Sequence, residues 1–205
     1  MTEVAGDIGA AKLAATLLLT GHGTPFVYYG EEIGMTGTKP DERIRTPMRW
    51  DATGSAGGFT TGTPWQALSD DPAGTDLATE REDSDSLWST YRDLIALRNA
   101  EPALRSGTLV PVETTDDAVV AYLRAATDPA DGAVLIVANV EDAAVPSFSV
   151  SLAEGPLCGI GRAEVLRGPA LAAPPTITAS GGFDDGEPLA EGLGPRETLI
   201  VGLRR

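Results

Sequence analysis

Two adjacent glutamates, Glu31 and Glu32, have the clearest capacity for chemistry in this sequence. They follow a short apolar and aromatic run in "GTPFVYYGEEIGM", residues 23–35. Paired carboxylates can act as acid and base only when both converge on one bond. Adjacent residues of an extended segment point to opposite faces. We therefore interpret neither glutamate as catalytic and expect one of them to tie the strand end to a neighbouring arginine.

Arg43 and Arg45 are the candidate substrate-binding residues. They lie with Arg49 in a segment rich in Gly, Thr, Pro and Asp, within an acidic chain. A guanidinium offers five donors in a fixed fork, which suits sugar hydroxyls or a carboxylate. Two alternatives stay open: either arginine could take this role, or Arg45 could only pin the loop by pairing with Asp41, Glu42 or Asp51.

Three aromatic residues, Trp50, Phe59 and Trp65, are interleaved with these arginines. They could stack against sugar rings or anchor a long loop by packing. Large aromatic side chains bury much area and often serve as anchors, so we expect packing.

Composition excludes several classes of function. The formal net charge of −15 opposes binding to a phosphate backbone, whereas a neutral sugar meets no such objection. The single cysteine, Cys158, and the single histidine, His22, exclude an internal disulfide and a Cys/His zinc site. We expect no metal or other cofactor in this chain. No run of about 20 apolar residues predicts a membrane span, and the first residues do not form a signal peptide.

The first half of the chain reads as an α/β region. Asp7 can cap a helix over residues 7–20, and Gly21 can end it. A strand buried on both faces is expected at 25–29. A long loop at 31–83 is expected to be functional because structureless loops of this length are uncommon. A second helix follows at 84–100.

The second half has an all-β texture. Short β-type runs alternate with Gly, Pro and Asp clusters, which is typical of an antiparallel β-sandwich. We therefore predict two domains, residues 1–103 and 104–205, and expect the second to fold by itself. The runs are "TLVPVET", "AVVAYLRA", "AVLIVANV", "SFSVSL", "AEVLRG", "TITA" and "ETLIVGLR".

Two motifs resemble the alpha-amylase superfamily of glycoside hydrolases. Gly23, Pro25, Tyr28, Gly30 and Glu32 match its eighth-strand pattern GxPxxYxGxE. "RTPMRWD", residues 45–51, is similar to the following loop in the alpha-glucosidase and oligo-1,6-glucosidase branch. The resemblance implies the last strand and helix of a (β/α)₈ barrel, followed by the family's C-terminal β-domain. It also points to Glu32 as the glutamate that pairs with an arginine of the rest of the barrel.

The resemblance implies that the chemistry lies outside this chain. The family's three catalytic carboxylates precede the eighth strand, so they have no matching positions here and none is carried over. The parent is then expected to hydrolyse α-glucosidic bonds of oligosaccharides, and this chain alone is expected to be inactive. Met1 resembles an internal methionine, so an N-terminal barrel portion is expected to be missing. The resemblance leaves room for calcium in the full-length parent and leaves open a cytoplasmic or a secreted location.

The sequence leaves two other functions open. A transglycosylase or isomerase of the same family, similar to a trehalose synthase, would carry the same motifs. A non-catalytic carbohydrate-binding or accessory β-sandwich should show a row of exposed aromatics. In residues 104–205 the only aromatics are Tyr122, Phe148 and Phe183, which are too few and scattered for such a row.

Overall fold

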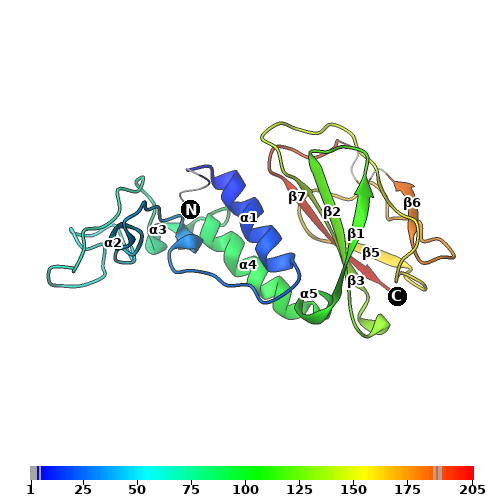
Figure 1. Cartoon of the computed structure of the whole chain (residues 1–205), viewed down its shortest axis with the longest axis horizontal. Coiled ribbons are helices and arrows are strands. Elements are labelled where there is room, and N and C mark those ends of the chain that lie inside the picture. The colour runs from blue at the N-terminus through cyan, green and yellow to red at the C-terminus, as the bar shows by residue number, and fades with distance from the viewer. Residues whose placement is uncertain (1–3, 5, 187, 189–190) are drawn as a thin grey trace. The chain divides into compact units, whose positions relative to one another are not determined.

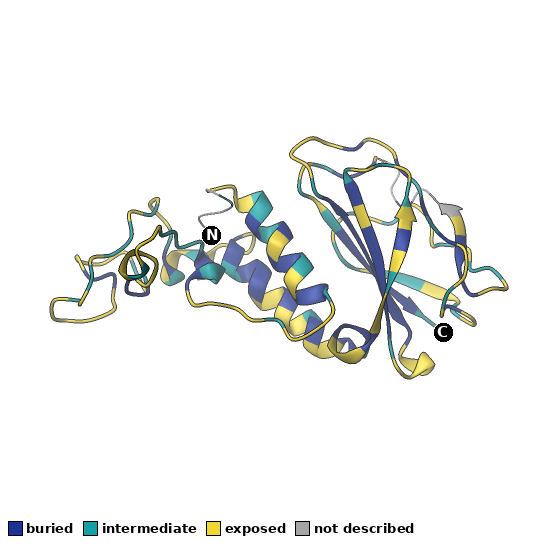
Figure 2. Cartoon of the chain, in the orientation of Figure 1, coloured by how far each residue is buried: buried dark blue, intermediate teal, exposed yellow. Residues whose placement is uncertain are grey.

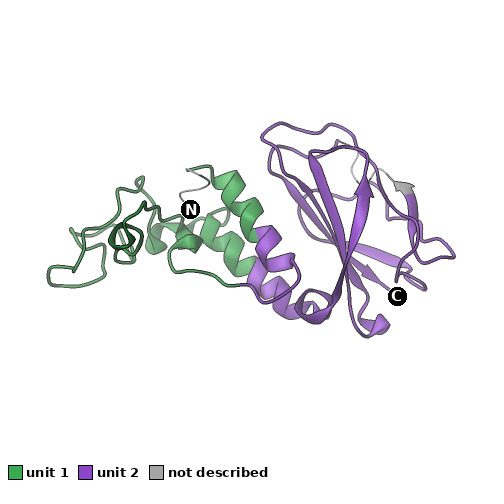
Figure 3. Ribbon diagram, viewed as in Figure 1, with its two compact units in different colours: residues 1–15, 26–93 green, residues 16–25, 94–205 purple. Residues whose placement is uncertain are grey.

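A computed structural model describes residue 4 and residues 6–186, 188 and 191–205 (Figure 1). Contacts group the chain into two compact units, residues 1–15 with 26–93 and residues 16–25 with 94–205 (Figure 3). The longest two helices each contribute to both units. The helical elements are α1 (Ile8–Thr20), η2 (Glu31–Ile33), α2 (Asp41–Ile44), α3 (Leu77–Glu82), α4 (Leu87–Ala100), α5 (Pro102–Ser106) and η3 (Pro129–Asp131).

Helix α1 begins and ends as the sequence predicts. The carboxylate of Asp7 accepts the backbone N–H of Ala10 at 2.9 Å, which caps the free N–H groups of the first turn. The N–H of Gly21 closes the last turn on the carbonyl of Leu17 at 2.9 Å. Small and apolar side chains of α1 are buried, so the helix packs along much of its surface.

Helix α4 matches the second predicted helix, although it starts three residues later. Ser86 takes the cap position, and its hydroxyl accepts the N–H of Ser89 at 3.0 Å. Leu87, Tyr91 and Leu94 are buried on one face. The helix ends before Pro102, which opens the short helix α5.

The strands form one antiparallel sheet in the order β5-β7-β3-β2-β1-β4-β6. All ladders are antiparallel, as predicted. Strand β1 pairs with β2 through its first five residues and with β4 through its last two. The strands are β1 (Thr108–Thr114), β2 (Val119–Ala125), β3 (Ala133–Asn139), β4 (Val150–Leu152), β5 (Arg162–Arg167), β6 (Phe183–Gly186) and β7 (Thr198–Arg204).

The core of the sheet lies on β2, β3 and β7 and is joined by side chains of β4 and β6. Every residue of β3 is buried (Figure 2). Leu135 of β3 and Val201 of β7 belong to the same apolar cluster as Val150 of β4 and Phe183 of β6, although β2 and β1 separate these pairs of strands in the order. The sheet therefore curves so that β3 and β7 share one core with β4 and β6.

The strand expected at 25–29 is wrong for this chain. No strand is assigned there, and the side chains are exposed, with Phe26 84% and Tyr28 51% accessible. Tyr28 and Tyr29 are both exposed, and their ring centroids lie 4.8 Å apart. A strand needs a hydrogen-bonded neighbour, and the described residues supply none to this segment.

Candidate functional site

The turn that carries the two glutamates depends on Gly30. Its φ of 85° is a left-handed conformation, and a Cβ there would lie 2.7 Å from the sulfur of Met35. Glu31 and Glu32 follow on the 3₁₀ turn η2, not on an extended segment as predicted. The carboxylate of Glu31 accepts the N–H of Tyr28 at 3.2 Å, which closes the turn.

Glu32 has a different environment. Its Oε2 atom is shielded from solvent, and the described part of the chain offers this atom no hydrogen-bond partner. A buried carboxylate oxygen without a donor is costly. The two glutamates therefore differ in their hydrogen bonding. Glu31 accepts a bond within the local turn, whereas Oε2 of Glu32 has no donor among the described residues.

Glu32 and Arg45 line one cavity of about 390 Å³. We call it the aromatic pocket; its lining includes Tyr29, Glu32, Arg45, Trp50, Phe59 and Trp65. Trp50, Phe59 and Trp65 are 48%, 45% and 62% accessible, so the expectation that they are packing anchors is wrong. Exposed aromatic faces beside a charged fork form a surface suited to a sugar ring.

Arg43 and Arg45 face different cavities. Arg43 lines a second cavity of about 330 Å³, the polar pocket, whose lining also includes Thr36, Thr38, Gln66, Ser69 and Asp70. Buried Thr46 contributes to the walls of both pockets. The structure therefore separates two arginines that sequence reasoning treated as rivals for one role.

Arg45 also forms an ion pair with Asp41, one of the three pairings that the sequence left open. Its Nη2 lies 3.2 Å from Oδ2 of Asp41, which Lys39 contacts as well. These contacts lower the pKa of Asp41, Lys39 having the larger effect. The side chains of Arg45 and Asp41 are 59% and 45% accessible, and exposed ion pairs contribute little to stability. Arg45 is thus held near the pocket without being buried in a strong pair.

The wall of the polar pocket is supported by Asp71, which sequence reasoning missed. The side chain of Asp71 is fully buried and accepts the N–H and the hydroxyl of Thr36 at 2.8 and 2.6 Å. It also accepts the hydroxyl of Ser69 and lies 3.3 Å from Nε of Arg49. Nothing in "SDDP" distinguishes Asp71 from its exposed neighbour Asp70, because its partners are distant in sequence.

Backbone hydrogen bonds place Trp50 at the pocket. The N–H of Trp50 donates to the carbonyl of Gly57 at 2.9 Å. The carbonyls of Arg49 and Trp50 accept the N–H groups of Leu77 and Ala78 at 3.0 Å each. These are first-turn donors of α3, which have no partner within the helix. The loop and α3 thus stabilise each other.

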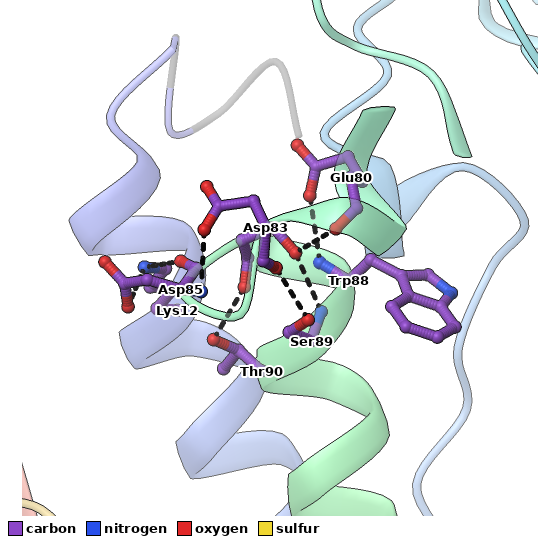
Figure 4. Close-up of polar contacts among 8 residues, drawn as sticks. Lys12, Glu80, Asp83, Asp85, Trp88, Ser89 and Thr90 are labelled. Carbon is purple, nitrogen blue, oxygen red and sulfur yellow. Dashed lines mark hydrogen bonds and ion pairs between the residues drawn. The ribbon is translucent and has the colours of Figure 1, made fainter. Parts of the chain in front are cut away.

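The junction of α3 and α4 fixes the other end of the loop (Figure 4). The Glu80 carboxylate accepts the N–H of Trp88 at 3.1 Å, and the Ser89 hydroxyl donates to the carbonyl of Asp83 at 2.8 Å. Lys12 of α1 pairs with Asp85 at 2.9 Å. The polar loop is therefore tied to two helices that the sequence predicts well.

The charges of both glutamates affect the pKa of Tyr91, a buried residue of α4. Burial raises the pKa of Tyr91 to about 12, and the negative charges of Glu31 and Glu32 act in the same direction. On the loop side, the Tyr29 hydroxyl donates to the carbonyl of Thr46 at 3.0 Å. Burial and Tyr28 raise the pKa of Tyr29 as well.

The remaining motif residues, Gly23 and Pro25, belong to the second unit. Gly23 has a φ of 101°, and its carbonyl accepts Nη2 of Arg98 at 2.7 Å. Pro25 lines a further cavity with His22. Within the described residues, no group of three His, Cys, Asp or Glu side chains is placed to hold a metal ion. Nor does any described helix have the length and apolar character to cross a membrane.

Comparisons with known proteins agree on one family. Residues 2–107 match the family model for the alpha amylase catalytic domain. The chain is 37% identical over 123 residues to alpha-amylase 3 of Dictyoglomus thermophilum, covering 59% of this chain and 24% of that protein. It is 31% identical over 153 residues to an oligo-1,6-glucosidase of Halalkalibacterium halodurans, covering 57% and 27%.

A solved structure extends the similarity to nearly the whole chain. The trehalulose synthase of Pseudomonas mesoacidophila aligns with a TM-score of 0.67 at 26% identity, over 96% of this chain and 38% of that protein. The chain spans about a quarter of the length of the two curated relatives above.

Proposed function

This chain belongs to the alpha-amylase family, and from that membership we propose that it is the C-terminal portion of a retaining hydrolase of α-glucosidic bonds in oligosaccharides. The observation that carries the proposal is the aromatic pocket, in which Glu32 and Arg45 lie beside exposed Trp50, Phe59 and Trp65. The chemistry would be double displacement through a covalent glycosyl-enzyme.

The pocket has the character of a sugar-binding surface. Aromatic faces give apolar contact with the C–H face of a pyranose, and a guanidinium donates to its hydroxyls. A neutral ligand is not repelled by the net charge of −15. Arg45 is the residue that we assign to substrate, and Arg43, in the polar pocket, is the second candidate.

We further propose that catalytic carboxylates come from a part of the protein outside this chain. Glu31 is engaged with the backbone of Tyr28, which leaves Glu32 without a converging partner carboxylate. The unpartnered Oε2 atom of Glu32 supports pairing with an arginine of a preceding barrel portion. This chain alone is then inactive.

We also propose a fold for each of the two parts of the chain. Residues 1–103 would be the end of a (β/α)₈ barrel, and residues 104–205 an antiparallel β-sandwich. The match of residues 2–107 to the catalytic-domain family model supports the first part. The shared core of β3, β7, β4 and β6 supports the second.

Binding of α-glucosides by the chain tests the proposal. Tryptophan fluorescence should change saturably on addition of maltose or isomaltose, because Trp50 and Trp65 line the pocket. Arg45→Ala and Trp65→Ala should each weaken binding by about tenfold, the loss of one hydrogen bond or stacking contact. Arg162→Ala, on the exposed strand β5, is the matched control and should bind as the unchanged chain does. Equal binding by all variants would rule out the aromatic pocket.

A transglycosylase or isomerase is the second candidate, because the trehalulose synthase aligns with 96% of this chain. Product analysis on the intact protein with sucrose and maltose distinguishes isomerised sugars from free glucose. An accessory carbohydrate-binding sandwich has no support, since Tyr122, Phe148 and Phe183 are all buried.

A further inference from the structure

The C-terminal end of α1 is held by two buried arginines of the second unit. Arg98, on α4, donates to the carbonyls of Leu19, Gly21 and Gly23 at 2.7, 3.3 and 2.7 Å. These contacts satisfy carbonyls that have no partner within the helix. The positive charge also suits the negative end of the helix dipole.

Arg124, on β2, approaches the same turn from the sheet. Its guanidinium donates to the carbonyls of Thr20, Gly21 and Gly107. A guanidinium has five N–H donors, so these three bonds do not use all the N–H groups of Arg124. Its Nε is not used: the atom is buried and has no partner among the described residues.

Neither arginine has a carboxylate partner among the described residues. Arg98 is 8% and Arg124 1% accessible. Burial lowers the pKa of both groups, and the charge of Arg98 lowers that of Arg124 further. Buried charges are normally paired, because removing an ion from water is costly. Carbonyl dipoles offset part of this cost but carry no net negative charge.

A cavity of about 360 Å³ opens beside the two arginines. We call it the arginine pocket; its lining includes His22, Arg98, Arg105, Gly107 and Arg124. Among the described residues, its lining includes no acidic side chain, although the chain has 30 Asp and Glu against 15 Lys and Arg. Three cations around one cavity in a chain with a net charge of −15 need an explanation beyond helix capping.

We propose that the arginine pocket binds an oxyanion, a carboxylate or a phosphate, between Arg98, Arg105 and Arg124. Guanidinium groups match the planar or tetrahedral oxygens of such groups with short, charge-assisted hydrogen bonds. The site is independent of the aromatic pocket, which lies in the other compact unit.

The only histidine of the chain, His22, is a direct reporter of this pocket. Phosphate and acetate are titrated separately into the ¹⁵N-labelled chain at constant ionic strength, and the imidazole signals of His22 are followed by NMR. We expect a saturable shift with at least one anion and a rise in the melting temperature of the β-domain at the same concentrations. The tighter of the two anions identifies the ligand class.

Arg105→Gln removes one cation without touching the groups that cap α1. Within the described part of the chain, the side chain of Arg105 donates to the carbonyl of Asn99 at 3.0 Å in an exposed contact and to no other group. We expect about tenfold weaker anion binding, corresponding to one charge-assisted hydrogen bond. Arg105→Lys should recover part of the affinity, and Arg162→Gln on β5 should have none of this effect.

Two results would overturn the proposal. One is a His22 response that does not saturate, or that chloride reproduces at equal ionic strength. The other is unchanged affinity in Arg105→Gln when its anion-free melting temperature equals that of the unchanged chain. Because the readout is His22, failure here leaves sugar binding at the aromatic pocket a separate question.

Discussion

Replacement of Asp71 by alanine should loosen the loop around the polar pocket, whose lining includes its partners Thr36 and Ser69. The substitution removes the acceptor of three hydrogen bonds, from the N–H and hydroxyl of Thr36 and from the hydroxyl of Ser69. It also leaves the Arg49 guanidinium, 21% accessible, without its carboxylate at 3.3 Å. Breaking a buried ion pair costs about 3–5 kcal/mol. We take about 3 kcal/mol because Arg49 is partly exposed.

The assay is hydrogen exchange of the loop amides together with denaturation followed by tryptophan fluorescence. A loss of about 3 kcal/mol raises the population of the open loop by about a hundredfold, so amides near residues 36 and 49–51 should lose that factor in protection. Asp71→Asn keeps one acceptor oxygen and should lose less. Asp70→Ala is the matched control, because Asp70 is adjacent and exposed. If Asp71→Ala costs no more than Asp70→Ala, the role assigned to Asp71 is wrong.

Three further predictions concern the same unit. The pKa of Tyr91 is raised from 10.0 to about 12, so its contribution to stability is present below about pH 10 and is lost toward about pH 12. Tyr91→Phe should therefore shift the midpoint of alkaline unfolding to higher pH. An unchanged midpoint would contradict this. Gly30→Ala should destabilise the unit by about 2 kcal/mol or more in urea denaturation, because φ is positive there and the added Cβ would contact Met35. Gly54→Ala is the control, since Gly54 has a φ of 59° and open space around it, and it should cost about 1 kcal/mol. Equal costs would refute the close contact at Gly30. Asp76→Ala removes the cap of α3 and should cost about 1 kcal/mol, visible as faster amide exchange in α3 alone; unaltered exchange there would show that the cap is unimportant.

Hydrophobic pattern was sufficient for the two longest helices and for most of the strands, whereas η2, α2 and α3 lie in the segment predicted as a loop. The helices at 7–20 and 84–100 were predicted from their apolar pattern and their caps. The strands β1, β2, β3, β4, β5 and β7 were predicted from short β-type runs bounded by turn residues. Strand β6, "FDDG", was missed because two acids and a glycine give no apolar alternation. The run "TITA" was predicted as a strand but forms only a single bridge, between Ile177 and Phe183.

The segment at 25–29 shows where pattern fails. Its apolar run has the composition of a buried strand, yet burial and pairing depend on neighbours that are not among the described residues. Long-range hydrogen bonds also cross the predicted domain boundary at residue 103. Arg124, in the predicted second domain, takes two of its three acceptors from Thr20 and Gly21 of the first. Local composition does not record such long-range bonds.

The candidate site was predicted by residue type more successfully than by arrangement. The arginines and aromatics of the loop were named from composition, and Arg45 does line a cavity with all three aromatics. That Arg43 faces a different pocket, and that Asp71 supports the wall, depends on contacts across 20 to 35 residues. Sequence spacing within an irregular loop does not encode these contacts.

The most direct test of the central claim is to measure binding and turnover of one α-glucoside by this chain in the same sample. The account predicts saturable binding at the aromatic pocket, weakened in Arg45→Ala, with no release of glucose above the uncatalysed rate. Glucose release that disappears in Glu31→Gln or Glu32→Gln, with binding retained, would contradict it and place the catalytic carboxylates within this chain.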